Sequence, residues 1–484
     1  MKKYKTKRLF IKDFSSNQSS DHSPYSLDIT TPKYSYNMLS KSGSLVSGLG
    51  LEHLTLPVSR TSSVEYARNE VQGVSFIKVW RYKYYSQNNS RYEYFLIAYG
   101  SDGKLYFNNM FFADSTFHQI NTTTFDKVPS ALLFRATNGL DVMAFCSQAD
   151  DMLVWYGDTS PYVLSSAPHL TSFSLHNNRL FAIDETGMFV KYSSQTNYLD
   201  WSSSSSGGEL ALNDYREELR KIISFKDNLY VFSDYGITKV MSYLSGTTFA
   251  TSNVFSTTEK IYADTACVCG SRIYFLTSGG LYFFNGYDTF KVDLSIDDML
   301  TMSEQKDSCM CYFGGKIYLS CHLKYNDESP SESALKNNCL VVINTSNHKC
   351  NITRGVDVSS MLALSDLSIK KLVLCIRNSG YLWQITEDGK LSGSSMTKFW
   401  KSGKIVLDNF DQDKILKKMY ITSSGNLTLT ISSERMSKSI SFSGSKSTTR
   451  KVVNVVGREF EMEISSSDEN FCLEKIEFLF VVEE

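Results

Sequence analysis

One short pattern recurs seven times along this chain of 484 residues. Each copy has a polar turn, a short apolar strand, a tight turn that usually contains glycine, and a second apolar strand. The first strands contain Phe95, Val142, Leu180, Leu229, Ile273, Ile317 and Leu372, so successive copies lie 38 to 55 residues apart. Hairpins that repeat every 40–50 residues, roughly, are typical of β-propeller blades. The sequence therefore predicts an all-β fold with a seven-bladed propeller, or a six-bladed one if one hairpin is misassigned.

The composition agrees with a strand-rich fold. The chain contains 30 Phe and 29 Tyr, which suit strands, and only 7 Pro, so its turns must depend on Gly, Asn, Asp and Ser. The 50 Lys and Arg residues nearly balance the 51 Asp and Glu residues, whereas a chain dedicated to coating nucleic acid would be distinctly basic. No run of about 20 apolar residues is present, so we expect no membrane-spanning segment.

The pattern divides the chain into four parts. Residues 1–24 form a basic, polar N-terminal arm, either a disordered tail or a segment ordered only against a neighbouring subunit or a polyanion. Residues 25–72 form an extended, turn-rich leading segment. The propeller is expected over 73–398. A C-terminal β-sandwich is expected over 399–484, where seven or eight alternating strands follow one another closely.

Local features add further expectations. An unclosed propeller leaves two bare sheet edges, so we expect blade seven to pair with a strand from 40–57 or with the chain around 390–408. Adjacent antiparallel strands are expected at 179–184/187–192 and 229–233/236–241. The remaining expectations are a long loop at 202–218 with room for a short helix, an exposed loop at 322–338, and a short helix at 295–305 with Ser295 as its N-cap.

The ten cysteines include two i, i+2 pairs, Cys267/Cys269 and Cys309/Cys311, on the first strands of neighbouring blades. A zinc site would need ligands that converge from turns, whereas i and i+2 residues on a strand share a face. Buried thiols that act as small apolar side chains are the simpler interpretation. Because the sequence begins without a signal peptide, we expect reduced thiols in a protein made in a cytoplasm.

The sequence contains no recognisable catalytic constellation. Its 7 histidines include no pair at helical ligand spacing around a Glu, and only His169 and His176 could converge within one blade. No nucleophile elbow and no glycine-rich phosphate loop follows a strand. We therefore expect no enzymatic activity, no cofactor and no metal site. A propeller that binds a receptor or a glycan is the alternative, although the loops differ from blade to blade.

Three stretches resemble the tail nozzle, or packaged-DNA-stabilising, β-propeller proteins of short-tailed bacteriophages. They are the leading segment LDITTPKYSYNMLSKSGSLVSGLGLEHL at 27–54, the blade LHNNRLFAIDETGMFVKYSSQTNYLDWSSSSSGGEL at 175–210, and the region from FWKSGKIVLDNF at 399–410 to LEKIEFLF at 473–480. Together they cover most of the chain, and the third is similar to the C-terminal sandwich of phage structural proteins. The high cysteine content departs from that family.

The resemblance implies a non-catalytic structural protein of the virion tail, made in the host cytoplasm. Such proteins assemble as homo-oligomeric rings, usually sixfold, beneath the portal and adaptor proteins, retain packaged DNA and form the ejection channel. Any contact with DNA would then be with its backbone in the lumen. For assembly we single out the cations of the basic arm, which are Lys2, Lys3, Lys5, Lys7 and Arg8.

Overall fold

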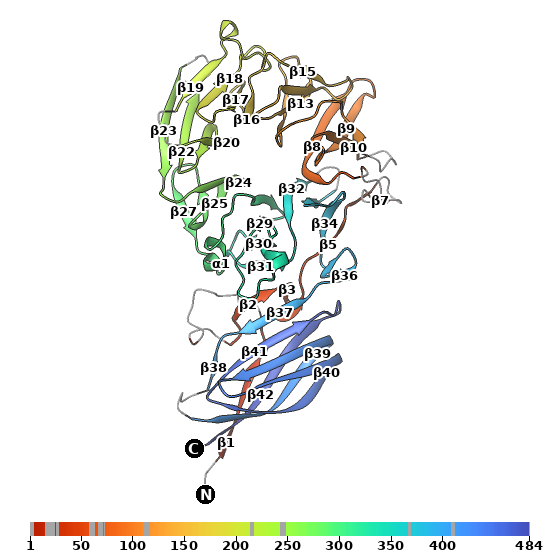
Figure 1. The fold of residues 1–484 in the computed structure, drawn as a ribbon, viewed down its shortest axis with the longest axis vertical. Coiled ribbons are helices and arrows are strands. Elements are labelled where there is room, and N and C mark those ends of the chain that lie inside the picture. The colour runs from red at the N-terminus through yellow and green to blue at the C-terminus, as the bar shows by residue number, and fades with distance from the viewer. Residues whose placement is uncertain are drawn as a thin grey trace.

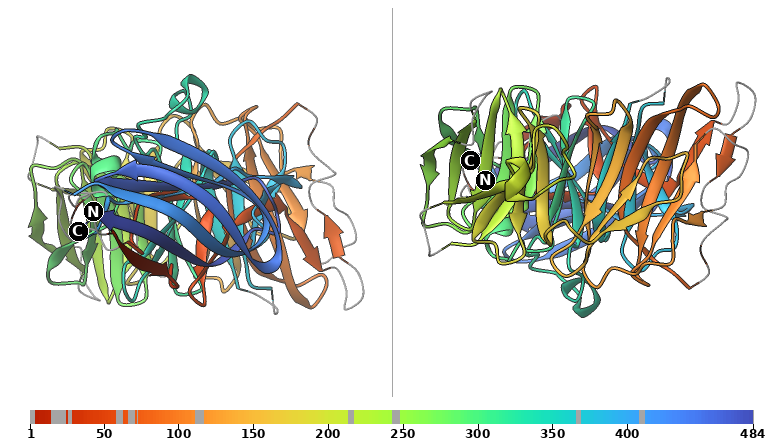
Figure 2. Two further views of the ribbon diagram at one scale, coloured as in Figure 1. Left: turned by 90° about the horizontal axis from the view of Figure 1, so that it is seen from below. Right: turned by 90° about the horizontal axis from the view of Figure 1, so that it is seen from above.

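The computed structural model describes residues 4–14, 25, 29–57, 63–65, 71, 73–110, 117–212, 217–242, 248–365, 369–407 and 412–483. The molecule is elongated, with a ring of blades at one end and a β-sandwich at the other (Figure 1). The first and last described residues, Tyr4 and Glu483, pair with each other in the sandwich, and views from above and below show the propeller edge-on (Figure 2).

The ring has seven blades, and the first six are four-stranded antiparallel sheets. Blade one contains β8 (Phe76–Ser86), β9 (Arg91–Gly100), β10 (Leu105–Asn109) and β11 (His118–Gln119). Blade two contains β12 (Ser130–Arg135), β13 (Asp141–Cys146), β14 (Met152–Trp155) and β15 (Tyr162–Leu164). Blade three contains β16 (Leu170–His176), β17 (Arg179–Asp184), β18 (Phe189–Tyr192) and β19 (Gly208–Ala211).

The remaining blades follow in order around the ring (Figure 1). Blade four contains β20 (Leu219–Phe225), β21 (Asn228–Ser233), β22 (Gly236–Ser242) and β23 (Phe249–Ser256). Blade five contains β24 (Ile261–Cys269), β25 (Arg272–Thr277), β26 (Gly280–Phe284) and β27 (Thr289–Val292). Blade six contains β28 (Cys309–Phe313), β29 (Lys316–Cys321), β30 (Cys339–Asn344) and β31 (Cys350–Arg354). The seven-bladed prediction is confirmed, as are both predicted strand pairs, β17/β18 and β21/β22.

Blade seven closes the ring with a strand from the N-terminal region. Its own strands are β32 (Val358–Leu364), β33 (Lys371–Ile376) and β34 (Leu382–Thr386). The outer edge of β34 pairs antiparallel with β5 (Gly50–His53), which confirms the predicted closure by a strand from 40–57. Two short strands extend this sheet, β35 (Lys390–Leu391) and β36 (Ser394–Ser395).

The second strand of each blade explains why the sequence pattern is so regular. Every residue of β17 is buried, for example, because this strand lies between two neighbouring blades as well as between two strands of its own sheet. Apolar side chains from adjacent blades fill the wedge between them, as where the rings of Phe232 and Phe275 pack edge to face at 5.5 Å. A strand buried on both faces must be almost continuously apolar.

The sandwich is built around one long hairpin, β39 (Lys414–Ser433) and β40 (Ser437–Gly457). Along its other edge, β39 pairs first with β42 (Cys472–Glu483) and then, beyond Gly425, with β41 (Glu459–Ser466). The sheet therefore divides into two layers. Their apolar faces enclose one core, in which the rings of Phe460 and Phe480 lie 5.1 Å apart.

The N-terminal segment completes both layers of the sandwich. β1 (Tyr4–Ile11) and β4 (Ser44–Ser47) pair with β42, and β3 (Met38–Lys41) pairs with β4. In the other layer β2 (Pro32–Tyr36) pairs with β37 (Lys398–Ser402), while β37 and β38 (Ile405–Val406) pair with β41. A separate two-stranded ribbon joins β6 (Thr55–Pro57) to β7 (Ser63–Glu65).

This arrangement corrects the expected N-terminal arm over residues 4–14. The prediction of a tail, or of an arm ordered only against a partner, overlooked the buried side chains Ile11 and Phe14, which are 0% and 2% exposed. β42 offers an open row of backbone groups, and β1 satisfies them with its own. The leading segment 25–72 is likewise divided between the sandwich and the propeller.

Three further expectations need correction. The predicted loop 202–218 contains a short helix, as expected, in the 3-10 helix η1 (Ser203–Ser205), but it also supplies β19, the outermost strand of blade three; its residues 213–216 lie outside the described residues. The predicted exposed loop 322–338 contains helix α2 (Pro330–Ser333), and its ends are buried where Asn338 hydrogen-bonds the backbone of Leu323. The short helix at 295–305 exists as α1 (Asp297–Thr301), but its N-cap is Ile296 rather than Ser295. None of the helices described is long and apolar enough to cross a membrane.

Candidate functional site

The cations singled out for assembly are in part embedded in the sandwich. Lys2 and Lys3 lie outside the described residues, whereas Lys5, Lys7 and Arg8 belong to β1. Alternation along the strand places Arg8 on the outer side of its layer, and Lys5 and Lys7 on the opposite side. Arg8 is ion-paired to Glu477 of β42 at 3.2 Å and keeps 65% of its side chain exposed.

Arg8 is part of a larger cationic surface, which we call the basic face. It is the outer side of the layer made by β1, β42, β39 and β40, and the register places its side chains in adjacent rows. The members of the basic face are Arg8, Phe10, Lys418, Tyr420, Arg450, Val452, Lys475, Glu477 and Leu479. Four of them are cations and one is a carboxylate. Phe10 and Val452, which are 38% and 53% exposed, add apolar area to this face.

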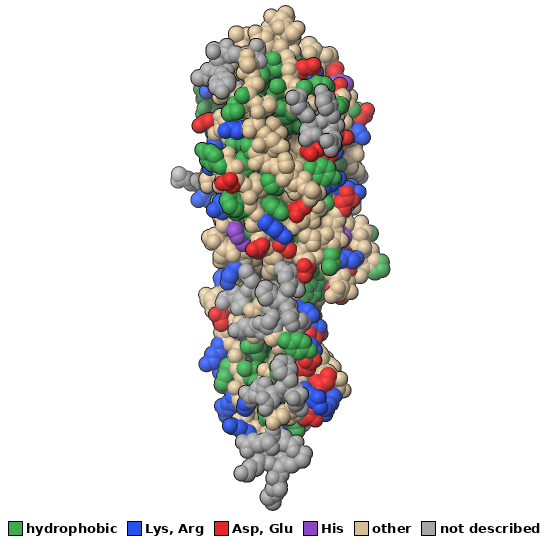
Figure 3. Space-filling model, turned by 90° about the vertical axis from the view of Figure 1, so that its left-hand side faces the viewer, with side chains coloured by type: hydrophobic (Ala, Val, Ile, Leu, Met, Phe, Trp, Pro, Cys, Tyr) green, Lys and Arg blue, Asp and Glu red, His purple; other side chains and the backbone are tan. Residues whose placement is uncertain are grey.

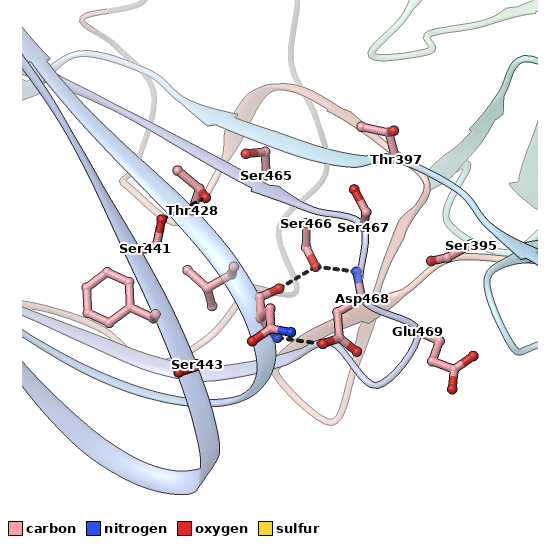
Figure 4. Close-up of a pocket in the computed structure, with 13 residues that line it drawn as sticks. Ser395, Thr397, Thr428, Ser441, Ser443, Ser465, Ser466, Ser467, Asp468 and Glu469 are labelled. Carbon is pink, nitrogen blue, oxygen red and sulfur yellow. Dashed lines mark hydrogen bonds between the residues drawn. The ribbon is translucent and has the colours of Figure 1, made fainter.

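A polar cleft of about 830 Å³ lies on the other layer of the sandwich (Figure 4). Strands β39, β40 and β41 contribute its floor, and the chain between β36 and β37 contributes one wall. The polar lining residues are Ser395, Thr397, Asn426, Thr428, Ser441, Ser443, Ser465, Ser466, Ser467, Asp468 and Glu469. Hydroxyl groups therefore dominate the surface of the cleft, and the one aromatic ring in its lining, Phe442, is 3% exposed.

The turn after β41 fixes the carboxylate end of this cleft. Asp468 accepts hydrogen bonds from the backbone amides of Asn426 and Asn470, both at 2.8 Å, and these bonds lower the pKa of Asp468. Ser466 donates to the carbonyl of Asn426 at 2.6 Å (Figure 4). Glu469 is held by Lys390, which lies outside the cleft. This set of fixed donors and acceptors suits a hydroxylated ligand.

The innermost strands of the propeller are tied to one another around the centre of the ring. These strands, the first of each blade, contact their neighbours in sequence. Side chains on these strands make six of the seven blade-to-blade ties. Five side chains donate to a backbone carbonyl of the next blade: Lys78 to Pro129, Ser130 to Thr171, Lys221 to Asp264 and Ala266, Cys309 to Val358, and Ser359 to Ile77. In the sixth tie, the hydroxyl of Ser172 accepts from the backbone amide of Ile222.

β-bulges explain why those backbone groups are available. The register shifts at Ile77 in β8 and at Thr171 in β16, so that each bulged residue lacks a regular partner in its own ladder. The carbonyls of these two residues accept the bonds from Ser359 and Ser130, at 2.7 and 2.6 Å. Burial lowers the pKa of Lys78 and of Lys221, whose ammonium groups are committed to backbone carbonyls. The ring of ties thus stabilises the propeller centre.

A cluster around Arg354 joins the propeller to the sandwich. The guanidinium of Arg354, at the end of β31, pairs with Glu332 through two bonds of 2.8 and 2.9 Å and with Asp327 at 3.0 Å. It also donates to the hydroxyl of Tyr34 in β2 at 2.7 Å and lies 4.1 Å from the ring centre of Tyr325. Burial lowers the pKa of Arg354, but the bonds to Glu332, Tyr34 and Asp327 outweigh it and raise the pKa overall.

The ten cysteines are free thiols, and Cys267/Cys269 and Cys309/Cys311 lie on the first strands of blades five and six as predicted. Burial raises the pKa of Cys309 and of Cys311 to about 12. Two further thiols, Cys321 and Cys339, face each other across β29 and β30 with their sulfur atoms 3.6 Å apart.

The two histidines that could have converged lie at opposite ends of β16. A seven-residue strand spans roughly 20 Å, so they cannot share a ligand. His169 contacts Asp151 at 3.3 Å and His176 contacts Ser224 at 2.9 Å. Within the described part of the chain, no group of three or more His, Cys, Asp or Glu side chains is placed to hold a metal ion.

Sequence reasoning missed Lys78, Lys221 and Arg354. In the sequence each is an ordinary cation on or near a strand, and no neighbouring residue indicates that it lies at the propeller centre or at the domain junction. The polar cleft had a weak signal, the run of serines in 437–447 that alternates with other residues.

No family model matches the chain, and neither does any curated protein. Solved structures similar to it include virginiamycin B lyase from Staphylococcus aureus, at 10% identity and a TM-score of 0.42 over 70% of this chain and 99% of that one. The WD40 domain of Pan2 from Neurospora crassa follows, at 7% identity and 0.39 over 70% and 94%. BamB from Moraxella catarrhalis has 8% identity and 0.36 over 72% and 93%. These likenesses extend to the β-propeller fold.

Proposed function

We propose that this protein is a non-catalytic structural component of a bacteriophage tail, a nozzle or head-to-tail ring component that retains packaged DNA and lines the ejection channel. Its partners would be further copies of the same chain in a ring, together with adaptor-side and tail proteins of the virion. The resemblance of three stretches to phage nozzle proteins supports this proposal. So does the architecture of one propeller and one sandwich, which matches what the resemblance implies.

The observation that carries the proposal is the way the two domains are joined. Strands from both chain ends build the sandwich, and only two residues separate β4 from β5, which closes the propeller. Arg354 of blade six contacts Tyr34 and Tyr36 of the sandwich. A ring subunit that resists the pressure of confined DNA needs a body without free hinges. The closed propeller, with its innermost strands tied to one another, meets the same need.

The test is electron cryo-microscopy of particles from a phage that carries this chain. We expect density for the propeller and sandwich in a ring below the portal. Particles whose tail lacks this chain, together with a purified protein that stays monomeric at every concentration tested, would contradict the proposal.

A second candidate function is favoured by the polar cleft. Its hydroxyl and carboxylate lining fits a hydroxylated ligand, so glycan binding stays the alternative, with the cleft of the sandwich rather than the propeller as the site. A glycan array with the full-length protein distinguishes the two. Binding that Asp468→Asn abolishes would favour receptor recognition.

A further inference from the structure

Although the net charge of the chain is close to zero, positive and negative side chains are concentrated on two different surfaces. One is the basic face of the sandwich. The other is the side of the propeller formed by the turns between second and third strands and by the connections from one blade to the next, which we call the acidic face. Figure 3 shows Lys and Arg side chains around the lower end of the elongated body, which is the sandwich, with Asp and Glu side chains among them on this side.

Carboxylates outnumber ammonium groups along the acidic face. In the described connections of blades one to five, its carboxylates are Asp102, Asp126, Asp150, Asp151, Glu185, Glu217, Glu218, Asp234, Glu259, Asp293, Asp297, Asp298, Glu304 and Asp307. The lysines of the same connections are Lys104, Lys127, Lys260 and Lys306. Some carboxylates are engaged locally, as where Arg220 pairs with Asp234 and Glu218. The segments nevertheless keep a clear negative excess.

Exposed apolar side chains accompany these carboxylates. Val128, Met188, Tyr235 and Met302 are 48%, 44%, 37% and 71% exposed, and each lies in or beside a connection of the acidic face. Val128 is two residues from the exposed Asp126, and Met188 is three residues from the exposed Glu185. The basic face repeats this mixture with the opposite charge, since Phe10 and Val452 lie among its cations.

We propose that the basic face of one copy docks on the acidic face of the next, so that the contact is head-to-tail. This inference rests on the proposed function, because it names the surfaces through which the ring would form. A contact between two different surfaces of the same chain repeats from copy to copy and closes into a ring when the rotation allows it. Charge complementarity would fix the orientation, and the apolar side chains would supply the dehydrated centre of the interface.

The apolar content favours a second copy over DNA as the occupant of the basic face. A surface that contacts only phosphates gains nothing from an exposed valine and phenylalanine, whereas protein interfaces are enriched in aromatic residues and arginine at their centre. The rows of the basic face also contain Leu479 between Arg8 and Lys418. Binding of duplex DNA by a protein that stays monomeric is thus the competing outcome.

The test uses the full-length protein in native mass spectrometry and in size-exclusion chromatography with light scattering. We expect an oligomer at about 50 mM salt that dissociates toward 500 mM, because exposed ion pairs are screened. Lys418→Glu with Arg450→Glu should raise the dissociation constant about tenfold or more. Asp126→Lys with Glu185→Lys, on the acidic face of the propeller, should raise the dissociation constant by a similar factor. Lys316→Glu with Lys370→Glu is the matched control, since both residues are exposed and lie outside the two faces.

Mixing the two interface variants gives the decisive measurement. The intact acidic face of the first variant meets the intact basic face of the second, so mixed complexes should form at a concentration at which each variant alone is largely dissociated. Circular dichroism verifies that each variant is folded. An oligomer that neither pair of reversals weakens would overturn the inference while leaving the ring proposal intact. DNA binding by a monomer that Lys418→Glu and Arg450→Glu abolish would also overturn it. A wild-type protein that is monomeric under all conditions would contradict both this inference and the proposed ring.

Discussion

Replacing Arg354 by alanine should loosen the junction between propeller and sandwich. Across the junction its guanidinium donates to the hydroxyl of Tyr34 at 2.7 Å, a charge-assisted bond that contributes about 1.5–3 kcal/mol. It also lies 4.8 Å from the ring centre of Tyr36, a contact that adds about 1–2 kcal/mol. The pairs with Glu332 and Asp327 lie within blade six, so they hold the guanidinium in place but do not themselves bridge the two domains. The two bridging contacts share one guanidinium and are not additive, so we expect about 3 kcal/mol, or roughly a hundredfold, in the opening of the junction.

Hydrogen exchange measures this opening directly. The amide of Asn37 donates to the carbonyl of Ile352 at 2.8 Å, and the amide of Arg354 donates to the side chain of Asn37, so both report the contact between β2 and β31. We expect both amides to lose protection in Arg354→Ala, while amides in the centre of blade two keep theirs. Arg354→Lys should lose less protection at these amides than Arg354→Ala does, because lysine keeps the charge but lacks the planar guanidinium with its several N–H donors.

Arg272→Ala is the matched control, because Arg272 lies over the ring of Phe283 at 4.3 Å in blade five and has no contact with the junction. Unchanged protection at Asn37 in Arg354→Ala, or equal losses in the alanine variant and in this control, would refute the reasoning.

Four other predictions follow from the same contacts. Burial raises the pKa of Glu332, but its bonds to Arg354 and Ser329 outweigh it and lower the pKa below 4.5. Glu332 holds the guanidinium that contacts Tyr34, so this support is fully present above pH 4.5 and is lost as the pH falls through the lowered value, as hydrogen exchange at Asn37 should show. Ser130→Ala and Ser359→Ala should each lower the free energy of unfolding, measured by chemical denaturation, by about 1 kcal/mol. The two losses should add in the double variant because the serines make separate ties, while Ser331→Ala should leave the free energy of unfolding unchanged. In the native protein at most the four half-buried thiols, Cys267, Cys309, Cys311 and Cys472, should react with a thiol reagent, and all ten should react after denaturation; stoichiometric zinc or a disulfide would contradict this. Deleting residues 1–12 should leave the propeller folded, as seen by near-ultraviolet circular dichroism, and expose β42 to proteolysis; an intact β42 would count against the pairing with β1.

The propeller could be predicted because its signal is local. The second and third strands of each blade are neighbours in sequence, and the second is apolar throughout, as in β17 and β21. Closure by β5 followed from the cost of two bare sheet edges rather than from any motif. The outermost strand of blade three was missed for the opposite reason. β19 alternates between half-buried and exposed residues and contains Gly208, so it lacks the apolar pattern of a strand.

β1 was missed because its polar residues concealed a buried side. Lys5, Lys7 and Arg8 dominate its composition, yet Leu9 and Ile11 face the sandwich core. Its partner, β42, lies at the other end of the chain, so no short-range pattern could reveal the pairing. The Arg354 cluster has the same character, since Tyr34 meets Arg354 across 320 residues of sequence. Interactions that depend on two distant segments leave no periodicity in either of them.

The position of β5 links the folding of the two domains. Only Gly48 and Leu49 separate β4, which pairs with β42 in the sandwich, from β5, which closes blade seven. The backbone at Gly48 has no room for a side chain, because a Cβ there would lie 2.6 Å from the carbonyl carbon of Asn37. The segment therefore cannot shift in the sandwich without moving the strand that closes the ring. Force applied to the sandwich, including any from a neighbouring copy on its basic face, would act on the closure of the propeller through these two residues.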